Sequence, residues 1–163
     1  MAPIPDGTDE FFFFNTRVTV RVPFTAGADT VSVLEHRAPV GDSPPLHRHV
    51  NEDEIFHVLE GTFRFRVGDR DVTAGAGEWL LVPKGVVHSY LVTSTGGGHW
   101  LTVTTQTDFE RFVRAIGRPA TGPGLPAPSG PPTPAQVAEL TQLAAQFGIE
   151  LVGPPLHGGD RTG

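Results

Sequence analysis

The chain has 163 residues, 38% of them hydrophobic, which is enough for one domain with a buried core. Its formal net charge is -6, and no run of Lys or Arg could follow a phosphate backbone, so nucleic acid is excluded as an expected partner. The lack of cysteine excludes disulfides, thiolate metal ligands and a cysteine nucleophile.

The first ten residues, MAPIPDGTDE, contain no basic segment of the kind that begins a secretory signal. No later stretch approaches the eighteen consecutive apolar residues that a membrane-spanning helix needs. We therefore expect a cytoplasmic protein with no membrane segment.

Composition divides the chain into four parts. Residues 1–14 form an N-terminal arm, 15–116 a β-barrel, 117–133 a Pro/Gly connector, and 134–163 a C-terminal helix and tail. The connector cannot sustain either the helical or the strand period, so we expect it to be extended.

The barrel is predicted from short β-type runs separated by turn residues, with little helical periodicity. Many short strands at a spacing of roughly ten residues favour an all-β sandwich or barrel. The predicted runs are 17–22, 30–37, 54–61, 62–72, 78–85, 86–92 and 99–106.

Two hairpin turns are predicted in this region. Glu60-Gly61 joins the run before it to Thr62-Phe63, and Gly68-Asp69 joins Phe65–Val67 to Asp71-Val72. Each glycine can adopt the positive φ that tight hairpin turns require.

Two helices follow the predicted strands. Asp108 is the predicted N-cap of the first, which ends at Gly117. The second begins with a capping box, Thr133 to Gln136, with Pro134 at its first position. The apolar stripes are Phe109, Phe112, Val113 and Ile116 in the first helix, and Val137, Leu140, Leu143, Ala144 and Phe147 in the second.

Chemistry-bearing residues are concentrated in PPLHRHVNEDEIFHVLEG, residues 44–61. His47 and His49 project from the same face of an extended chain, about 7 Å apart. Glu54 lies at an odd offset from His49, so the chain must turn at 50–53 for its carboxylate to face the two imidazoles. We expect Glu52 and Asp53 to be solvated turn acids, and Asp53 to be the one able to orient a ligand.

A fourth group follows a strand and a Pro-x-Gly turn, which bring His88 back across the barrel. Three imidazoles and one carboxylate suit a divalent first-row metal with open coordination positions. His57 is expected to face outward. The sequence does not determine which face of its strand His99 occupies, so His99 is expected to be a ligand or a cavity residue.

The aromatic residues of the strands are expected to fill a small barrel interior, and some of them to line a substrate cavity. These candidates are Phe56, Phe63, Phe65, Tyr90 and Trp100.

These motifs resemble those of the cupin superfamily. Gly41, His47, His49, Glu54 and Gly61 match every fixed position of its first motif. The second motif is matched by Gly77, Pro83, Gly85 and His88, but Val92 stands where the family often has Asn.

The resemblance covers about residues 15–116, and the chain is most similar to single-domain cupins like quercetin 2,3-dioxygenase. It implies a jelly-roll barrel, a double-stranded β-helix of two sheets, with His47, His49, Glu54 and His88 as metal ligands near one end.

The resemblance further implies a dioxygenase-like oxidoreductase, with Glu54 as ligand and catalytic base for a small aromatic or enolisable substrate. A redox-neutral isomerase, cyclase or hydrolase, and a small-molecule-binding module without turnover, are the alternatives. The donor set favours Fe, Mn or Ni, with Co, Cu or Zn also compatible. We expect a homodimer, paired through sheet edges and apolar terminal segments.

Overall fold

The computed structural model describes residues 9–159. Residues 1–8 of the predicted arm and residues 160–163 of the predicted tail lie outside the described residues.

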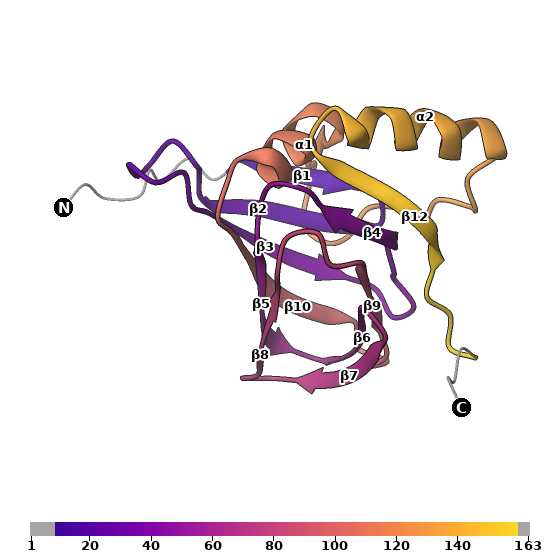
Figure 1. The fold of residues 1–163 in the computed structure, drawn as a ribbon. Helices are drawn as coiled ribbons and strands as arrows, with labels where there is room; N and C mark the ends of the chain where they lie inside the picture. Colours follow the sequence, from indigo (N-terminus) through magenta and orange to yellow (C-terminus); the bar gives the residue numbers. More distant parts are fainter. Residues whose placement is uncertain (1–8, 160–163) are drawn as a thin grey trace.

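Two antiparallel sheets form the molecule, as the all-β prediction required (Figure 1). The large sheet has the order β11 (Arg118–Pro119), β1 (Glu10–Phe13), β2 (Thr16–Val22), β3 (Ser32–Ala38), β10 (Gly98–Thr104), β5 (Glu54–Glu60), β8 (Trp79–Val82). The small sheet has the order β12 (Ile149–Pro155), β4 (Pro45–His49), β9 (His88–Val92), β6 (Thr62–Val67), β7 (Arg70–Gly75). Each predicted run contains at least one strand.

The turn at Glu60-Gly61 corrects one prediction. It does not close a hairpin, because β5 lies in the large sheet and β6 in the small one. Gly61 has φ +88°, and a Cβ there would lie 2.4 Å from the carbonyl oxygen of Gly97, so glycine is needed where the chain crosses between sheets. The second predicted hairpin is confirmed, because β6 and β7 pair around Gly68-Asp69.

The space between the sheets is filled by side chains that alternate along the strands. Phe63 and Phe65 are each 1% exposed, whereas Arg64 and Arg66 between and after them face away from the core. Together with Phe56, Val58 and Trp100, these phenylalanines belong to one buried cluster.

Both predicted helices are present, with differences at their ends. Helix α1 (Asp108–Ile116) has Thr107 as its N-cap, so Asp108 is its first helical residue and not its cap. Helix α2 (Pro134–Ala145) begins with the predicted capping box at Thr133. Val137, placed in the docked stripe by its spacing, is 44% exposed.

Four strands, β1, β4, β11 and β12, lie outside the predicted runs. β1 comes from the phenylalanine-rich segment at residues 11–14 and pairs with both β2 and β11. Phe13, from its inner side, packs against α1 through Phe109 and Phe112. β12 follows α2 and pairs with β4, so the C-terminal segment completes the small sheet beside His47 and His49 (Figure 1).

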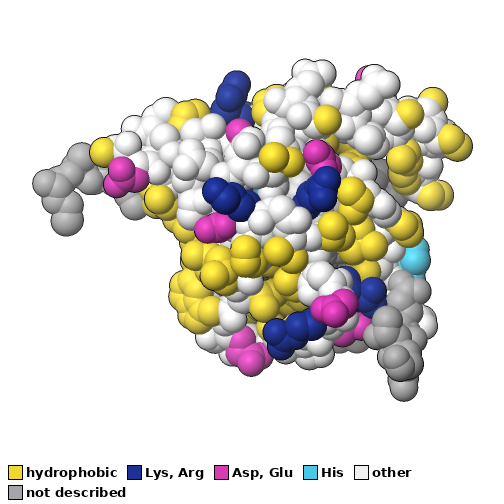
Figure 2. Space-filling model, in the orientation of Figure 1, with side chains coloured by type: hydrophobic (Ala, Val, Ile, Leu, Met, Phe, Trp, Pro, Cys, Tyr) yellow, Lys and Arg dark blue, Asp and Glu magenta, His cyan; other side chains and the backbone are white. Residues whose placement is uncertain are grey.

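The surface carries one apolar region of note. Figure 2 shows hydrophobic side chains gathered where β5 and β8 lie in Figure 1. Trp79 and Leu81 of the edge strand β8 are 62% and 56% exposed. Within residues 9–159, no helix has the length and hydropathy needed to cross a membrane.

Candidate metal centre

The structure brings together the four residues expected to ligate a metal. His47 and His49 extend from β4, His88 begins β9 opposite His47, and Glu54 begins β5 in the other sheet. One donor atom from each residue lies within 4.8 Å of all the others. His49, Glu54 and His88 are buried, and His47 is partly exposed. The open side of the cluster is therefore at His47.

The outer nitrogen of each imidazole is held by an acceptor. Nδ1–H of His47 donates to the Pro45 carbonyl at 2.8 Å, and Nδ1–H of His88 donates to the Val86 carbonyl at 3.0 Å. Carbonyl oxygens only accept, which fixes the proton on Nδ1 and leaves Nε2 as the donor toward the centre.

The inner nitrogens surround the Glu54 carboxylate. Oε2 of Glu54 lies 2.8 Å from Nε2 of His88 and 3.4 Å from Nε2 of His49. His88 thus has an acceptor on both sides, although a neutral imidazole has only one N–H. Nε2 of His49 is buried and has no hydrogen-bond partner among the described residues. A cation between these atoms would satisfy the acceptors and the orphaned nitrogen together, so the donor set fits a divalent metal.

The charges reinforce this arrangement. Burial raises the pKa of Glu54, but His49, His88 and His47 outweigh it and lower that pKa to about 2. Burial and the neighbouring His88 and His49 lower the pKa of His47 to about 3. Near neutral pH the site therefore offers an ionised carboxylate and a neutral His47, the protonation states that metal ligation requires.

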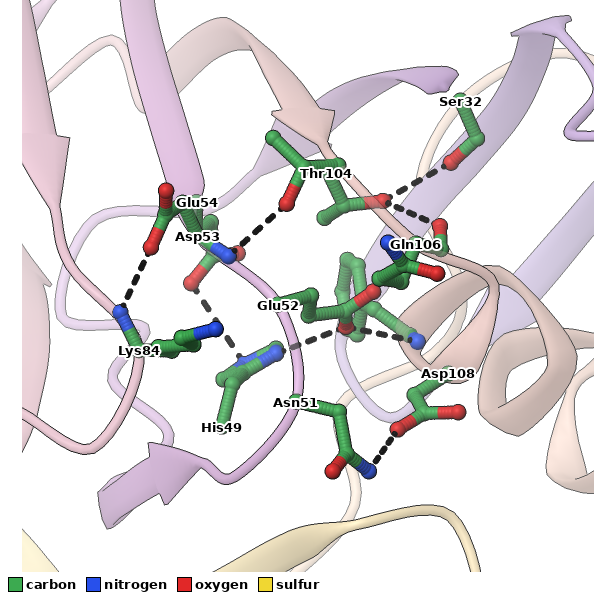
Figure 3. A network of polar contacts seen from close by, with 12 residues as sticks. Ser32, His49, Asn51, Glu52, Asp53, Glu54, Lys84, Thr104, Gln106 and Asp108 are labelled. Atoms are coloured by element: carbon green, nitrogen blue, oxygen red, sulfur yellow. Dashed lines mark hydrogen bonds and ion pairs between the residues drawn. The ribbon is translucent and has the colours of Figure 1, made fainter. Parts of the chain in front are cut away.

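Glu52 corrects the sequence interpretation. It is not a solvated turn acid: it is 1% exposed, and its Oε1 lies 2.8 Å from Nδ1 of His49 (Figure 3). Asp53, expected to orient a ligand, instead accepts the backbone N–H of Lys84 at 2.9 Å. The acid three residues after His49, not four, contacts the ligand histidine. Its burial depends on α1 packing over the loop, which local sequence does not show.

The remaining histidines lie outside the cluster. His57 faces outward and stacks on Trp79 with ring centroids 3.8 Å apart. His99 lies on the outer face of the large sheet, where Nε2–H donates to Glu35 at 2.7 Å. It borders a cavity of about 650 Å³ lined by glycines and other small or apolar residues together with six charged residues, Glu10, Arg17, Arg21, Glu35, Arg37 and Glu60. His36, assigned no chemistry from sequence, is buried and stacks on Trp100 at 4.9 Å.

The five aromatic residues predicted to line a substrate cavity contact one another beside the donor cluster. Phe56 lies 6.3 Å from the His88 ring and 6.4 Å from Tyr90, and Tyr90 lies 5.0 Å from Trp100. Phe63 and Phe65 stack at 5.8 Å. Burial, followed by the nearby Asp42, raises the pKa of Tyr90, which keeps its hydroxyl protonated, and this hydroxyl donates to Asp42. Phe56, Phe63, Phe65 and Trp100 are at most 3% exposed and belong to the buried core cluster, and Tyr90 packs against that cluster.

Comparison with known proteins agrees with this geometry. Residues 33–104, which contain all four donors, match the family described as "Cupin domain". Over these residues the chain is similar to cupin domains. A quercetin 2,3-dioxygenase of Bacillus subtilis is 31% identical over 93 residues, covering 55% of this chain. The match spans only 26% of that relative's length.

Solved structures show the cupin fold at lower identity. A predicted oxalate decarboxylase of Thermotoga maritima superposes with a TM-score of 0.58 at 22% identity, covering 65% of this chain and 99% of that one. The polyketide cyclase of Streptomyces resistomycificus has a TM-score of 0.54 at 21% identity, with 64% and 78% covered. These likenesses establish the jelly-roll fold.

Proposed function

We propose that this protein is a metal-dependent oxidoreductase, a dioxygenase that acts on a small aromatic or enolisable substrate. The observation that carries the proposal is the convergence of three imidazole Nε2 atoms and one ionised carboxylate, all within 4.8 Å. The similarity to a quercetin 2,3-dioxygenase supports the choice of reaction class, although this chain spans about a quarter of that protein.

In this proposal His47, His49, Glu54 and His88 hold one divalent ion, with Fe, Mn or Ni favoured over Co, Cu or Zn. When bound, the ion supplies Lewis-acid polarisation of an oxygen-rich substrate and open coordination positions. The protein's part is to direct Nε2 of all three histidines inward and to keep His47 neutral. The Nδ1 hydrogen bonds supply this orientation before any ligand arrives.

Glu54 has a second role as the proton acceptor. Its carboxylate is ionised near neutral pH, and Oε2 lies 2.8 Å from His88, so a proton taken from a substrate hydroxyl can be shared with an imidazole. Because its pKa is low, the Glu54 carboxylate binds a proton weakly, and it is better suited to binding a metal ion than to acting as a base. We therefore expect proton transfer to contribute less than metal ligation does.

The substrate is proposed to approach from the His47 side, where the cluster is least buried. Phe56, Phe63, Phe65, Tyr90 and Trp100 would then form an apolar wall beside it, with the Tyr90 hydroxyl as a polar contact. A wall of this kind suits a flat, weakly polar ring better than a phosphorylated sugar.

Metal analysis combined with oxygen-uptake measurement tests the proposal. The purified protein is analysed for bound transition metals, reconstituted with Fe(II), Mn(II) or Ni(II), and incubated with flavonols and related phenols. The matched control is the H47A/H49A double variant. We expect one ion per chain and oxygen consumption in the wild type, and neither in the variant. Product formation that continues unchanged without dioxygen contradicts the oxidative reaction.

The same experiment distinguishes the alternatives. Full activity with redox-inert Zn(II) under anaerobic conditions would identify an isomerase, cyclase or hydrolase. Recovery of an unchanged bound small molecule would identify a binding module.

We further propose a cytoplasmic homodimer. The exposed Trp79 and Leu81 on the edge strand β8 support a contact between subunits. Light scattering after size exclusion should give twice the chain mass of 17.4 kDa. A monomer mass would contradict it.

A further inference from the structure

The three histidines of the donor cluster are not held alike. His47 and His88 donate Nδ1–H to backbone carbonyls, whereas His49 donates to a side chain, Glu52. Both side chains of the His49–Glu52 pair are almost fully buried, with 2% and 0% exposed. A carboxylate is thus placed out of water against the outer nitrogen, Nδ1, of only one of the three imidazoles.

Glu52 makes a second contact through the same oxygen. Oε1 accepts the backbone N–H of Phe109, the second residue of α1, at 2.8 Å. The Thr107 side chain gives this helix no capping hydrogen bond within the described residues, so Glu52 serves as its cap from 57 residues away. The helix N-terminus in turn favours negative charge on Glu52.

We propose that Glu52 is a positioning residue of the metal centre: its carboxylate fixes the tautomer of His49 and strengthens Nε2 as a metal donor. This inference rests on the proposed metal-dependent function. A carboxylate that accepts from the far nitrogen of a ligand histidine orients the ring and raises its basicity. A backbone carbonyl orients the ring with only partial negative charge, so His49 becomes the strongest of the three imidazole donors.

The arrangement also links the metal centre to the C-terminal part of the fold. The Phe109 ring contacts the His49 ring edge-on at 5.7 Å, and Asn51 donates to Asp108 at 2.7 Å (Figure 3). Helix α1 therefore contacts the turn at two neighbouring residues, Asn51 and Glu52. A bound metal and a docked α1 stabilise the same position of His49.

The test compares E52Q and E52A with wild type. E52Q retains an oxygen that can accept from His49 and Phe109 but removes the charge, whereas E52A removes both. E35Q is the matched control, because Glu35 also accepts from a histidine, His99 at 2.7 Å, but on the outer face. Affinity for Co(II) is measured by competition with a chelator, and thermal unfolding of the metal-free proteins reports the capping role.

We expect Co(II) affinity to fall about 10-fold in E52Q and up to about 100-fold in E52A, and to change less than about twofold in E35Q. The unfolding temperature should fall clearly only in E52A. Imidazole ¹⁵N NMR of the metal-free proteins should show His49 protonated on Nδ1 in wild type and partly on Nε2 in E52A. The NMR measurement reports the protonation of the His49 ring directly, so it depends neither on enzymatic activity nor on a bound metal.

The outcomes separate this inference from the proposed function. If wild type binds no Co(II), the metal-dependent function fails. If wild type binds Co(II) and E52Q binds it equally well, the positioning role of the charge is overturned, whatever E52A does. Should E52A fail to fold, E52Q and the control still decide the question.

Discussion

Two clusters of histidine and glutamate occupy opposite faces of the same sheets. On the inner face, one nitrogen each of His47, His49 and His88 and one carboxylate oxygen of Glu54 lie within 4.8 Å of one another. On the outer face, His99 bonds Glu35, which also pairs with Arg21 at 2.5 Å. The residue types are the same, but the outer carboxylate of Glu35 is paired with both Arg21 and His99, whereas Nε2 of His49 on the inner face has no hydrogen-bond partner among the described residues.

Burial decides the difference in behaviour. Burial raises the pKa of Glu35, but Arg21 and His99 outweigh it and lower that pKa; the Arg21 side chain remains 47% exposed. Such a network is screened by water and salt and contributes little to stability. The inner cluster is shielded from water, so its charges act strongly on one another and on any ion they bind.

Removing histidines should have the largest effect on metal affinity, and only when the histidines belong to the inner cluster. The H47A/H49A variant loses two of four ligands from a site whose binding energy for a divalent ion is on the order of 10 kcal/mol, so its affinity should fall more than roughly a thousandfold. The outer-face variant H99A should bind metal like wild type. Equilibrium dialysis with metal analysis checks both. Equal loss in H99A would abolish the distinction between the faces.

The next effect concerns a buried histidine beside the inner cluster, His36. Burial lowers its pKa to about 4, against opposing contributions from Glu54 and Glu35. Since the unfolded chain binds a proton near pH 6.5 and the native state does not, stability falls as the pH drops from about 6.5 to 4. His36 should account for about 3 kcal/mol of this fall.

The variant H36F tests this linkage, because its ring can keep the stack with Trp100 without titrating. Its free energy of unfolding should change about 3 kcal/mol less than that of wild type between pH 7 and pH 4. Denaturant titrations of metal-free protein at both pH values measure the difference. Parallel losses in the two proteins would show that His36 does not drive acid unfolding.

A smaller effect on stability is expected from a methyl group added at Gly98, where β10 packs against the buried core. A Cβ at Gly98 of β10 would lie 2.4 Å from Cζ of Phe63, which is 1% exposed. Overpacking of this kind costs about 1–3 kcal/mol, so G98A should lower the unfolding temperature. The control G96A lies two residues earlier, where a Cβ meets no described atom within 4 Å. Similar stability of the two variants would mean that the interior is loosely packed.

The smallest effect is expected on the outer face. R21A removes the ion pair with Glu35 but leaves the Glu35–His99 hydrogen bond. The free energy of unfolding should fall by less than about 1 kcal/mol, and the difference should shrink at high salt. Denaturant titration at low and high ionic strength measures it. A loss of several kcal/mol, insensitive to salt, would show that this network behaves like a buried one.

The sequence was sufficient for the features that depend on local periodicity. The spacing of His47 and His49 placed both on one face, and the motif around Thr133 placed the start of α2, because strand alternation and capping act over a few residues. The positive φ of Gly61 was also predictable. The path of the chain after Gly61 was not predictable, because a hairpin turn and a crossing between two sheets both require a positive φ at this residue.

Features that depend on distant contacts were missed. Glu52 looks like a surface acid until α1 packs over it, and the N–H of Phe109 that it accepts lies 57 residues away. β12 contains Gly153 and two prolines, a composition that argues against a strand, yet it pairs with β4 at the sheet edge, where proline is tolerated. In both cases tertiary packing overrode local preference.

The place of β12 has a consequence for how the protein matures. Ile149 and Leu151 pair with His49 and His47, so the strand that carries two metal donors is an open sheet edge until the chain has been synthesised to residue 155. During synthesis on the ribosome the barrel strands emerge first. The strand β12, which pairs with the strand of His47 and His49, emerges about a hundred residues later. The strand that carries His47 and His49 therefore gains its second neighbouring strand only after the last strand has docked.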